Sequence, residues 1–130
     1  RSLMHGTTAS ERDWPREPAP QAALLAGFFA RHLQAHFTVE EDLVFPAARS
    51  AGREAESLVV QLMAEHREMA SLVERLAANP QVTAAELAAF GKLLNDHIRL
   101  EDRQLFPLME TQMQGDALLD LQQRVEARYG

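Results

Sequence analysis

One motif occurs twice in this 130-residue chain and constrains its fold more than any other feature. Segments 36–46 and 97–107 both read His-x-x-x-Glu-acidic-x-x-apolar-Phe-Pro. Residues four apart lie on the same face of an α-helix, about one turn apart. Each His can therefore direct an imidazole nitrogen, and its Glu a carboxylate oxygen, at a common point. The repeat predicts two helices that together offer four convergent ligands: His36, Glu40, His97 and Glu101.

Hydrophobic periodicity around the repeat predicts three long helices. Steps of three and four over residues 21–45 predict a helix that ends near Pro46. A second helix follows the break at residues 50–52 and stops at Asn79-Pro80, and a third opens with a Thr83/Glu86 capping box and ends near Pro107. The expected stripes are Leu25, Phe29, His32, His36, Val39 and Leu43; Val59, Leu62, His66, Met69, Val73 and Leu76; and Leu87, Phe90, Leu94, His97, Glu101 and Leu105.

The two ends of the chain carry weaker helical patterns. A short helix over residues 3–13 is interrupted by prolines from Pro15 on, and residues 116–129 form a last helix, entered through Gly115 with Asp116 as N-cap, that packs outside the bundle. No segment shows the period-two alternation that predicts a strand. We expect one all-α domain over residues 1–130: an up-and-down four-helix bundle with a short or irregular first helix and an additional C-terminal helix.

The repeated His and Glu residues lie within the apolar stripes, so the fold would bury them. The apolar stripes of the helices would face one another in a buried seam. Burying a carboxylate is costly unless it is paired or binds a metal, and here two carboxylates occupy matched positions in this seam. His66 occupies the corresponding position of its helix, and His5 could add a fourth imidazole. Such donors without sulfur suit iron, with zinc or manganese as alternatives, and four imidazoles with two carboxylates are enough for two ions. The predicted metal ligands are His5, His36, Glu40, His66, His97 and Glu101.

Several neighbours of these residues are open to other interpretations. His32 lies one turn before His36 and could be a ligand, a hydrogen-bond partner of a ligand, or a histidine near the bundle end. Glu41, Glu65 and Asp102 are adjacent to proposed ligands and could substitute as carboxylate donors or orient an imidazole, but adjacency rotates them about 100° off the seam, which favours a solvated face. The Phe and Met residues are treated as core with no specific role.

Composition excludes several classes of function. The chain has no Cys, hence no disulfide and no thiolate site, and its net charge of −6 without a Lys/Arg cluster makes nucleic acid an unlikely partner. No apolar run is long enough for a membrane span. Without a secretory signal pattern, a cytoplasmic location is expected by default. A ferritin-like site would need Glu-x-x-His pairs, a spacing that Glu65-His66 and His97-x-x-x-Glu101 do not have.

Over roughly residues 24–108 the doubled His-x-x-x-Glu with its Phe-Pro ending resembles the hemerythrin family, in the branch with the His-His-Glu cation-binding signature. The resemblance implies a non-haem di-iron centre, with His36 and His97 as terminal ligands, Glu40 and Glu101 as bridging carboxylates and His66 as a further ligand. His5 falls where the family's first-helix histidine is expected. The oxygen carriers have a His-x-x-x-His pair on the third helix, whereas Leu62 and Ala70 flank His66 here. This departure argues against reversible oxygen carriage.

Three functions follow from these residues. The first is a di-iron protein that binds or reacts with dioxygen, peroxide or nitric oxide, in sensing, iron handling or protection from oxidants. The second is a di-iron enzyme that consumes peroxide or oxidises a substrate, although no residue is assigned a catalytic role. The third is a structural or partner-binding bundle with zinc or no metal. The sequence leaves the oligomeric state open, a homodimer included.

Overall fold

The computed structural model describes residues 16–129, and within this range it is helical with no strand. The predicted all-α bundle is confirmed. The expected helix over residues 3–13, and His5 with it, lies outside the described residues. No helix among residues 16–129 is long and apolar enough to cross a bilayer.

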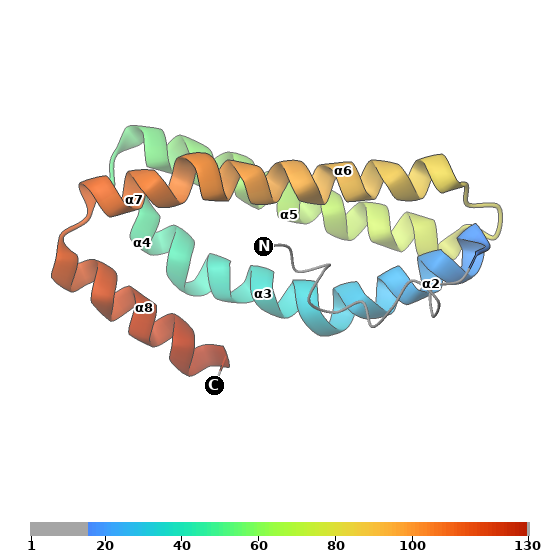
Figure 1. Ribbon diagram of the computed structural model, residues 1–130, viewed down its shortest axis with the longest axis horizontal. Helices are drawn as coiled ribbons and strands as arrows, with labels where there is room; N and C mark the ends of the chain where they lie inside the picture. Colours follow the sequence, from blue (N-terminus) through green and yellow to red (C-terminus); the bar gives the residue numbers. More distant parts are fainter. Residues whose placement is uncertain (1–15, 130) are drawn as a thin grey trace.

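Three long helical rods run side by side, and a shorter helix folds back along the first rod (Figure 1). Residues 18–49 form the first rod, α5 the second and residues 84–112 the third. Short turns at residues 50–52 and 79–83 reverse the direction of the chain between them. In chain order the elements are α2 Pro18–Phe28, η2 Phe29–Leu33, α3 Gln34–Val39, η3 Glu40–Val44, α4 Phe45–Arg49, α5 Arg53–Ala78, α6 Ala84–Leu100, η4 Glu101–Leu105, α7 Phe106–Gln112 and α8 Gly115–Tyr129.

Local sequence signals fix most of the rod ends. Gly52 precedes α5 with a φ of 115°, a conformation that residues with a Cβ rarely adopt. The predicted capping box is present, since Thr83 Oγ1 accepts a hydrogen bond from the Glu86 backbone and the Glu86 side chain accepts one from the Thr83 backbone. The expectation for Asp116 is wrong: α8 begins at Gly115, which places Asp116 inside its first turn.

The two prolines of the repeat do not end their helices, contrary to expectation. The first rod continues past Pro46 to Arg49, and the third past Pro107 to Gln112. A π-helical segment, η3 or η4, ends just before each Phe-Pro pair, so the proline lies in the first turn of a new α-helical segment. There a missing N–H and a fixed φ are tolerated, because the preceding wide turn has already interrupted the regular hydrogen-bond ladder.

The π-helical segments also correct the expected stripe of the first rod. His32 is exposed and Leu43 only half-buried, whereas Leu33, Phe37 and Phe45 are buried. The buried positions Leu25, Phe29, Leu33 and Phe37 follow in steps of four across η2. A pure α-helix would drift off the core over such a run, and the wider turn keeps it facing inward. The six stripe residues predicted for α5 are all buried, as are five of the six predicted for the third rod.

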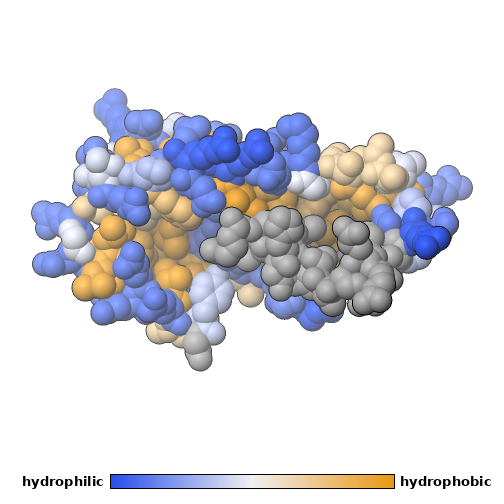
Figure 2. All heavy atoms as spheres, in the orientation of Figure 1, coloured by the Kyte–Doolittle hydropathy of each residue, from blue (hydrophilic) through white to orange (hydrophobic). Residues whose placement is uncertain are grey.

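Within residues 16–129 the hydrophobic core consists of two clusters that lie on either side of a layer of buried polar residues. In Figure 2 apolar atoms are visible between α8 and the rods, while much of the outer surface is hydrophilic. The first cluster is Ala22, Leu25, Phe29, Leu33, Phe37, Met69, Val73, Leu76, Val82, Phe90 and Leu94. The second is Phe45, Ala48, Ala51, Ala55, Leu58, Val59, Leu62, Leu105, Met109 and Leu121. Leu121 belongs to α8, which contacts η3 and α7 on the outside of the rods.

Candidate metal centre

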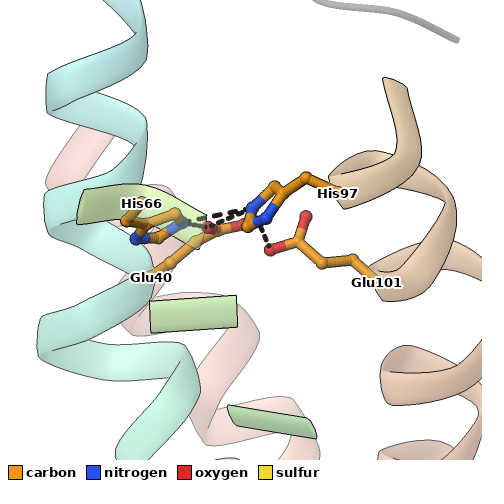
Figure 3. Close-up of side chains that lie close together, drawn as sticks. All are labelled: Glu40, His66, His97 and Glu101. Carbon is orange, nitrogen blue, oxygen red and sulfur yellow. Dashed lines mark hydrogen bonds and ion pairs between the residues drawn. The ribbon is translucent and has the colours of Figure 1, made fainter. Parts of the chain in front are cut away.

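Four buried polar side chains meet between the two apolar clusters. Glu40 comes from the first rod, His66 from α5, and His97 and Glu101 from the third rod, so all three rods contribute (Figure 3). One potential ligand atom of each residue lies within 4.8 Å of those of the other three. The structure thus brings together four of the six residues predicted as ligands.

Distances within this cluster show that its imidazoles converge through the same ring nitrogen. The Nε2 atoms of His66 and His97 lie 3.2 Å apart. Glu40 Oε1 lies 3.0 Å from His66 Nε2 and 3.9 Å from His97 Nε2. Glu101 Oε2 lies 3.4 Å from His97 Nε2. Two nitrogens and two carboxylates therefore surround a common point.

The fifth predicted ligand, His36, joins the cluster through the second oxygen of Glu40. His36 Nε2 lies 3.1 Å from Glu40 Oε2, whereas the other oxygen, Oε1, faces His66 and His97. The carboxylate of Glu40 thus stands between one imidazole on one side and two on the other. This is an arrangement in which one carboxylate can serve two positions.

Each of the three imidazoles has a partner at its outer nitrogen, Nδ1. Glu41 lies 2.6 Å from His66 Nδ1 and Glu65 lies 2.7 Å from His97 Nδ1. For these two carboxylates the contacts fit the alternative that they orient an imidazole, and the favoured expectation of a solvated face is wrong. A Glu side chain is long enough to reach back from a position beside the seam to a ring at its edge. Asp102 is exposed, as expected. Such outer partners fix the tautomer and the orientation of a metal-binding histidine.

The third outer partner comes from the far end of the chain. Tyr129 in α8 lies with its hydroxyl 2.8 Å from His36 Nδ1. Sequence reasoning missed Tyr129, and no local signal could have found it, since 93 residues separate the two partners.

Aromatic rings enclose the histidines from the side of the first rod. Phe37 stacks on His66 with ring centroids 3.8 Å apart and an interplanar angle of 12°. Phe45 adds a second ring 5.5 Å from His66. These rings keep the surroundings of the polar atoms apolar, which strengthens electrostatic interactions among them.

Burial and mutual contacts shift the pKa values of three groups. Burial raises the pKa of Glu40, but hydrogen bonds from His36, His66 and His97 outweigh burial and hold it well below its usual range. Burial, together with the neighbouring Glu40, raises the pKa of Glu101 to about 8 despite the opposing effect of His97. Burial favours neutral His97, but Glu101, Glu40 and Glu65 raise its pKa to about 10. At neutral pH, Glu40 is ionised while Glu101 and His97 hold protons.

The donor set fits a metal cation. Glu101 Oε2 is buried and forms no hydrogen bond among the described residues, and its contact with His97 Nε2 is long at 3.4 Å, so a metal cation would satisfy this oxygen better. Imidazole nitrogens with carboxylate oxygens suit iron, zinc or manganese. The buried Glu/His/His/Glu cluster therefore suits metal binding.

The structure does not bring His32 into this cluster. His32 is exposed, and its ring centroid lies 5.2 Å from that of Phe28 on the same helix. Of the three interpretations left open for His32, ligation has no support in the geometry.

A comparison with protein families agrees with the site. The model of the hemerythrin HHE cation binding domain matches residues 2–109. Separate comparisons with curated proteins and with solved structures found no match. The match spans most of the chain. It includes the five predicted ligands that meet in the structure, four from the repeated motif and His66 from α5. The chain belongs to the hemerythrin HHE cation-binding domain family.

Proposed function

We propose that this domain holds a non-haem di-iron centre that binds or reacts with dioxygen, peroxide or nitric oxide. One observation carries the proposal: the two oxygens of Glu40 face different histidines, Oε2 toward His36 and Oε1 toward His66 and His97. A carboxylate in this position would bridge two ions. Bound iron would supply the redox chemistry that such small ligands require, and the chain's own residues would hold it and limit access to it.

The two sides of Glu40 differ in how many donors they have. His66, His97, Glu101 and Glu40 Oε1 form a four-donor set on one side. On the other side the described residues supply His36 and Glu40 Oε2. We propose that His5 completes this second side, as the family resemblance implies. The proposed ligand set is then His5, His36, Glu40, His66, His97 and Glu101.

A hollow at the surface supports access by a small ligand. Its volume is about 210 Å³, and its lining includes Phe37, Thr38, Glu41, His66 and Arg67. It reaches the outer edge of His66 between α3 and α5. A diatomic molecule or peroxide fits such a space.

Metal analysis tests the proposal. Protein reconstituted anaerobically with ferrous iron and then desalted should hold about two irons per chain, the number that a bundle with paired carboxylates and histidines binds. Exposure to air should give near-ultraviolet charge-transfer absorption of ferric iron. The variant Glu101→Gln should lose iron, whereas Asp102→Asn, which changes the exposed carboxylate next to it, should not. Iron-free, colourless wild-type protein would contradict the proposal.

The same experiment addresses His5 and the alternative of a single zinc. His5→Ala should lower the iron content from about two per chain to about one, because the four-donor side stays intact. Four donors are also the number that zinc takes in structural sites. Zinc at one ion per chain in protein purified without added metal, with no gain from iron, would favour that alternative and a structural role.

A further inference from the structure

Helix α8 lies beyond the segment that the family model matches, yet its last described residue reaches the metal centre. The match ends at residue 109, and α8 spans Gly115–Tyr129. The helix turns back after α7 and runs beside α3 and α4 (Figure 1). Its role is therefore a property of this chain that the family match does not describe.

Three contacts fasten α8 along its length. Leu121 is buried in the second apolar cluster. Near the end of the helix, Arg128 forms an ion pair of 3.1 Å with Asp42, two residues after Glu40. Tyr129 then places its hydroxyl 2.8 Å from His36 Nδ1, and the two rings lie nearly parallel with centroids 6.2 Å apart. Apolar and ionic contacts thus bring the phenol to the imidazole.

The contact completes a pattern at the site. His66 and His97 have Nε2 turned inward and Nδ1 held by Glu41 and Glu65, respectively. His36 also has Nε2 turned inward, toward Glu40, and its outer partner is Tyr129. An outer hydrogen bond of this kind sets which nitrogen carries the proton and how the ring is oriented toward a metal.

We propose that Tyr129 is a positioning residue for His36, so that α8 orients one of the imidazoles of the metal centre. This rests on the proposed metal-binding function. With a metal at Nε2, the proton of His36 resides on Nδ1, and Nδ1–H donates a hydrogen bond to Tyr129 Oη. The phenol is a neutral acceptor, whereas the other two histidines face carboxylates, which accept more strongly. His36 is consequently the least strongly supported of the three imidazoles.

Zinc is a suitable probe, because Zn²⁺ is diamagnetic and accepts the same donors. In ¹⁵N-labelled, zinc-loaded wild-type protein we expect a slowly exchanging Nδ1–H signal from His36, assigned by its loss in His36→Gln. Tyr129→Phe keeps the ring and removes only the hydroxyl. In this variant the His36 signal should broaden or vanish through exchange with water, while the Nδ1–H signals of His66 and His97 persist.

Affinity provides the second measurement. Competition with a chromophoric chelator should show that Tyr129→Phe binds the zinc on the His36 side of Glu40 about 10-fold more weakly, the lower end of the effect of losing an outer partner, while the zinc of the four-donor side is unaffected. Arg128→Gln, which removes the ion pair and keeps the phenol, should weaken binding less. Leu119→Ala changes an exposed residue of the same helix and serves as the control. The melting temperature of the metal-free variants should stay near that of wild type.

The outcomes separate the two proposals. Wild-type protein that binds neither zinc nor iron overturns the metal-binding function and this inference with it. Wild-type protein that binds zinc on the His36 side, with an unchanged His36 signal and unchanged affinity at that side in Tyr129→Phe, overturns the role of Tyr129 alone. Equal losses in Tyr129→Phe and Leu119→Ala would assign the effect to the packing of α8 and also contradict a positioning role.

Discussion

The two copies of the repeated motif have the same local structure and different surroundings. In each copy the Glu is the first residue of a π-helical segment and lies one turn after its His. The side chain of His36 is 32% exposed with a phenol as its outer partner, whereas that of His97 is 1% exposed with the carboxylate of Glu65 as its partner. The copies therefore share their backbone geometry and differ in burial and in outer partner.

The two glutamates differ even more. Contacts with three histidines hold the pKa of Glu40 well below its usual range, while burial and the nearby Glu40 raise the pKa of Glu101 to about 8. The motif places both carboxylates in the seam, but their neighbours decide which one is ionised. Two copies of one motif thus supply one charged group and one group that holds its proton, which a bound metal would displace.

The largest effect is expected at Glu40. Glu40→Gln removes the ionised carboxylate that faces protonated His97 and the other imidazoles, leaving a buried positive charge with less compensation. We expect the free energy of unfolding of the metal-free protein to fall by about 3–5 kcal/mol, as when one partner of a buried ion pair is removed. Urea unfolding in the presence of a chelator at pH 7 measures it. A loss below about 1 kcal/mol would contradict the ionised state of Glu40.

A second effect is a fall in the stability of the metal-free protein as pH rises. His97 titrates near 10 in the folded state against 6.5 in an unfolded chain, so its contribution is complete below about pH 6.5 and is lost toward pH 10. Glu101, with a folded-state pKa of about 8, favours the folded state less as pH rises from 4.5 to 8. Both shifts have the same sign, and we expect the free energy of unfolding to fall between pH 6 and pH 9.

Added metal should act in the opposite direction over the same range. Metal must displace these protons, so zinc should raise the melting temperature more at pH 9 than at pH 6. Melting curves with chelator and with zinc, at matched ionic strength, measure both trends. A stabilisation by zinc that is independent of pH would contradict the assigned protons.

Replacing the outer carboxylates Glu65 and Glu41 should weaken metal binding, and the two variants should differ from each other by a small margin. Glu65→Gln replaces a side chain that is 16% exposed, and Glu41→Gln replaces one that is 38% exposed. Loss of such a partner weakens metal binding about 10- to 100-fold. We expect Glu65→Gln to fall in the upper part of this range and Glu41→Gln in the lower part, because water screens the more exposed pair. Zinc competition titrations measure it, and a reversed order would contradict the role assigned to burial.

The smallest effect on metal-free stability is expected at Glu101. At pH 7 most Glu101 side chains carry a proton, and an amide imitates a neutral carboxyl group in size and polarity. Glu101→Gln should change the free energy of unfolding at pH 7 by less than about 1 kcal/mol, within the range of a neutral hydrogen bond. The contrast with Glu40→Gln, measured under the same conditions, tests the asymmetry directly. Equal losses in the two variants would refute it.

The buried polar cluster could be predicted from the sequence because its signal is local. The four-residue spacing within each His/Glu pair, and the place of His66 in the stripe of α5, fix which side chains face the seam. The course of the helices beyond Pro46 and Pro107 could not be predicted with α-helical rules, because π-helical segments allow those prolines. A signal for such segments exists in the runs of buried positions in steps of four, as at Leu25, Phe29, Leu33 and Phe37.

The sequence left the outer partners Glu41 and Glu65 as one alternative among several and did not indicate Tyr129, because outer partners depend on how helices pack. Glu41 and Glu65 lie off the seam by periodicity, and only the distance between neighbouring rods decides whether their side chains reach a ring. Tyr129 depends on the direction in which α8 folds back after residue 112. Periodicity identifies the face of one helix, but it does not identify a contact between side chains of different helices.

The polar layer between the two apolar clusters also bears on how the molecule unfolds. On every rod the buried polar residues separate the residues of one cluster from those of the other, with Glu40 between Phe37 and Phe45, for example. Without metal, hydrogen bonds and ion pairs among the buried polar side chains connect the two halves of the core. With metal, one ion bound by Glu40, His66, His97 and Glu101 would link all three rods. Hydrogen exchange should then show two separately opening units in chelated protein and a single cooperative unit once metal is bound.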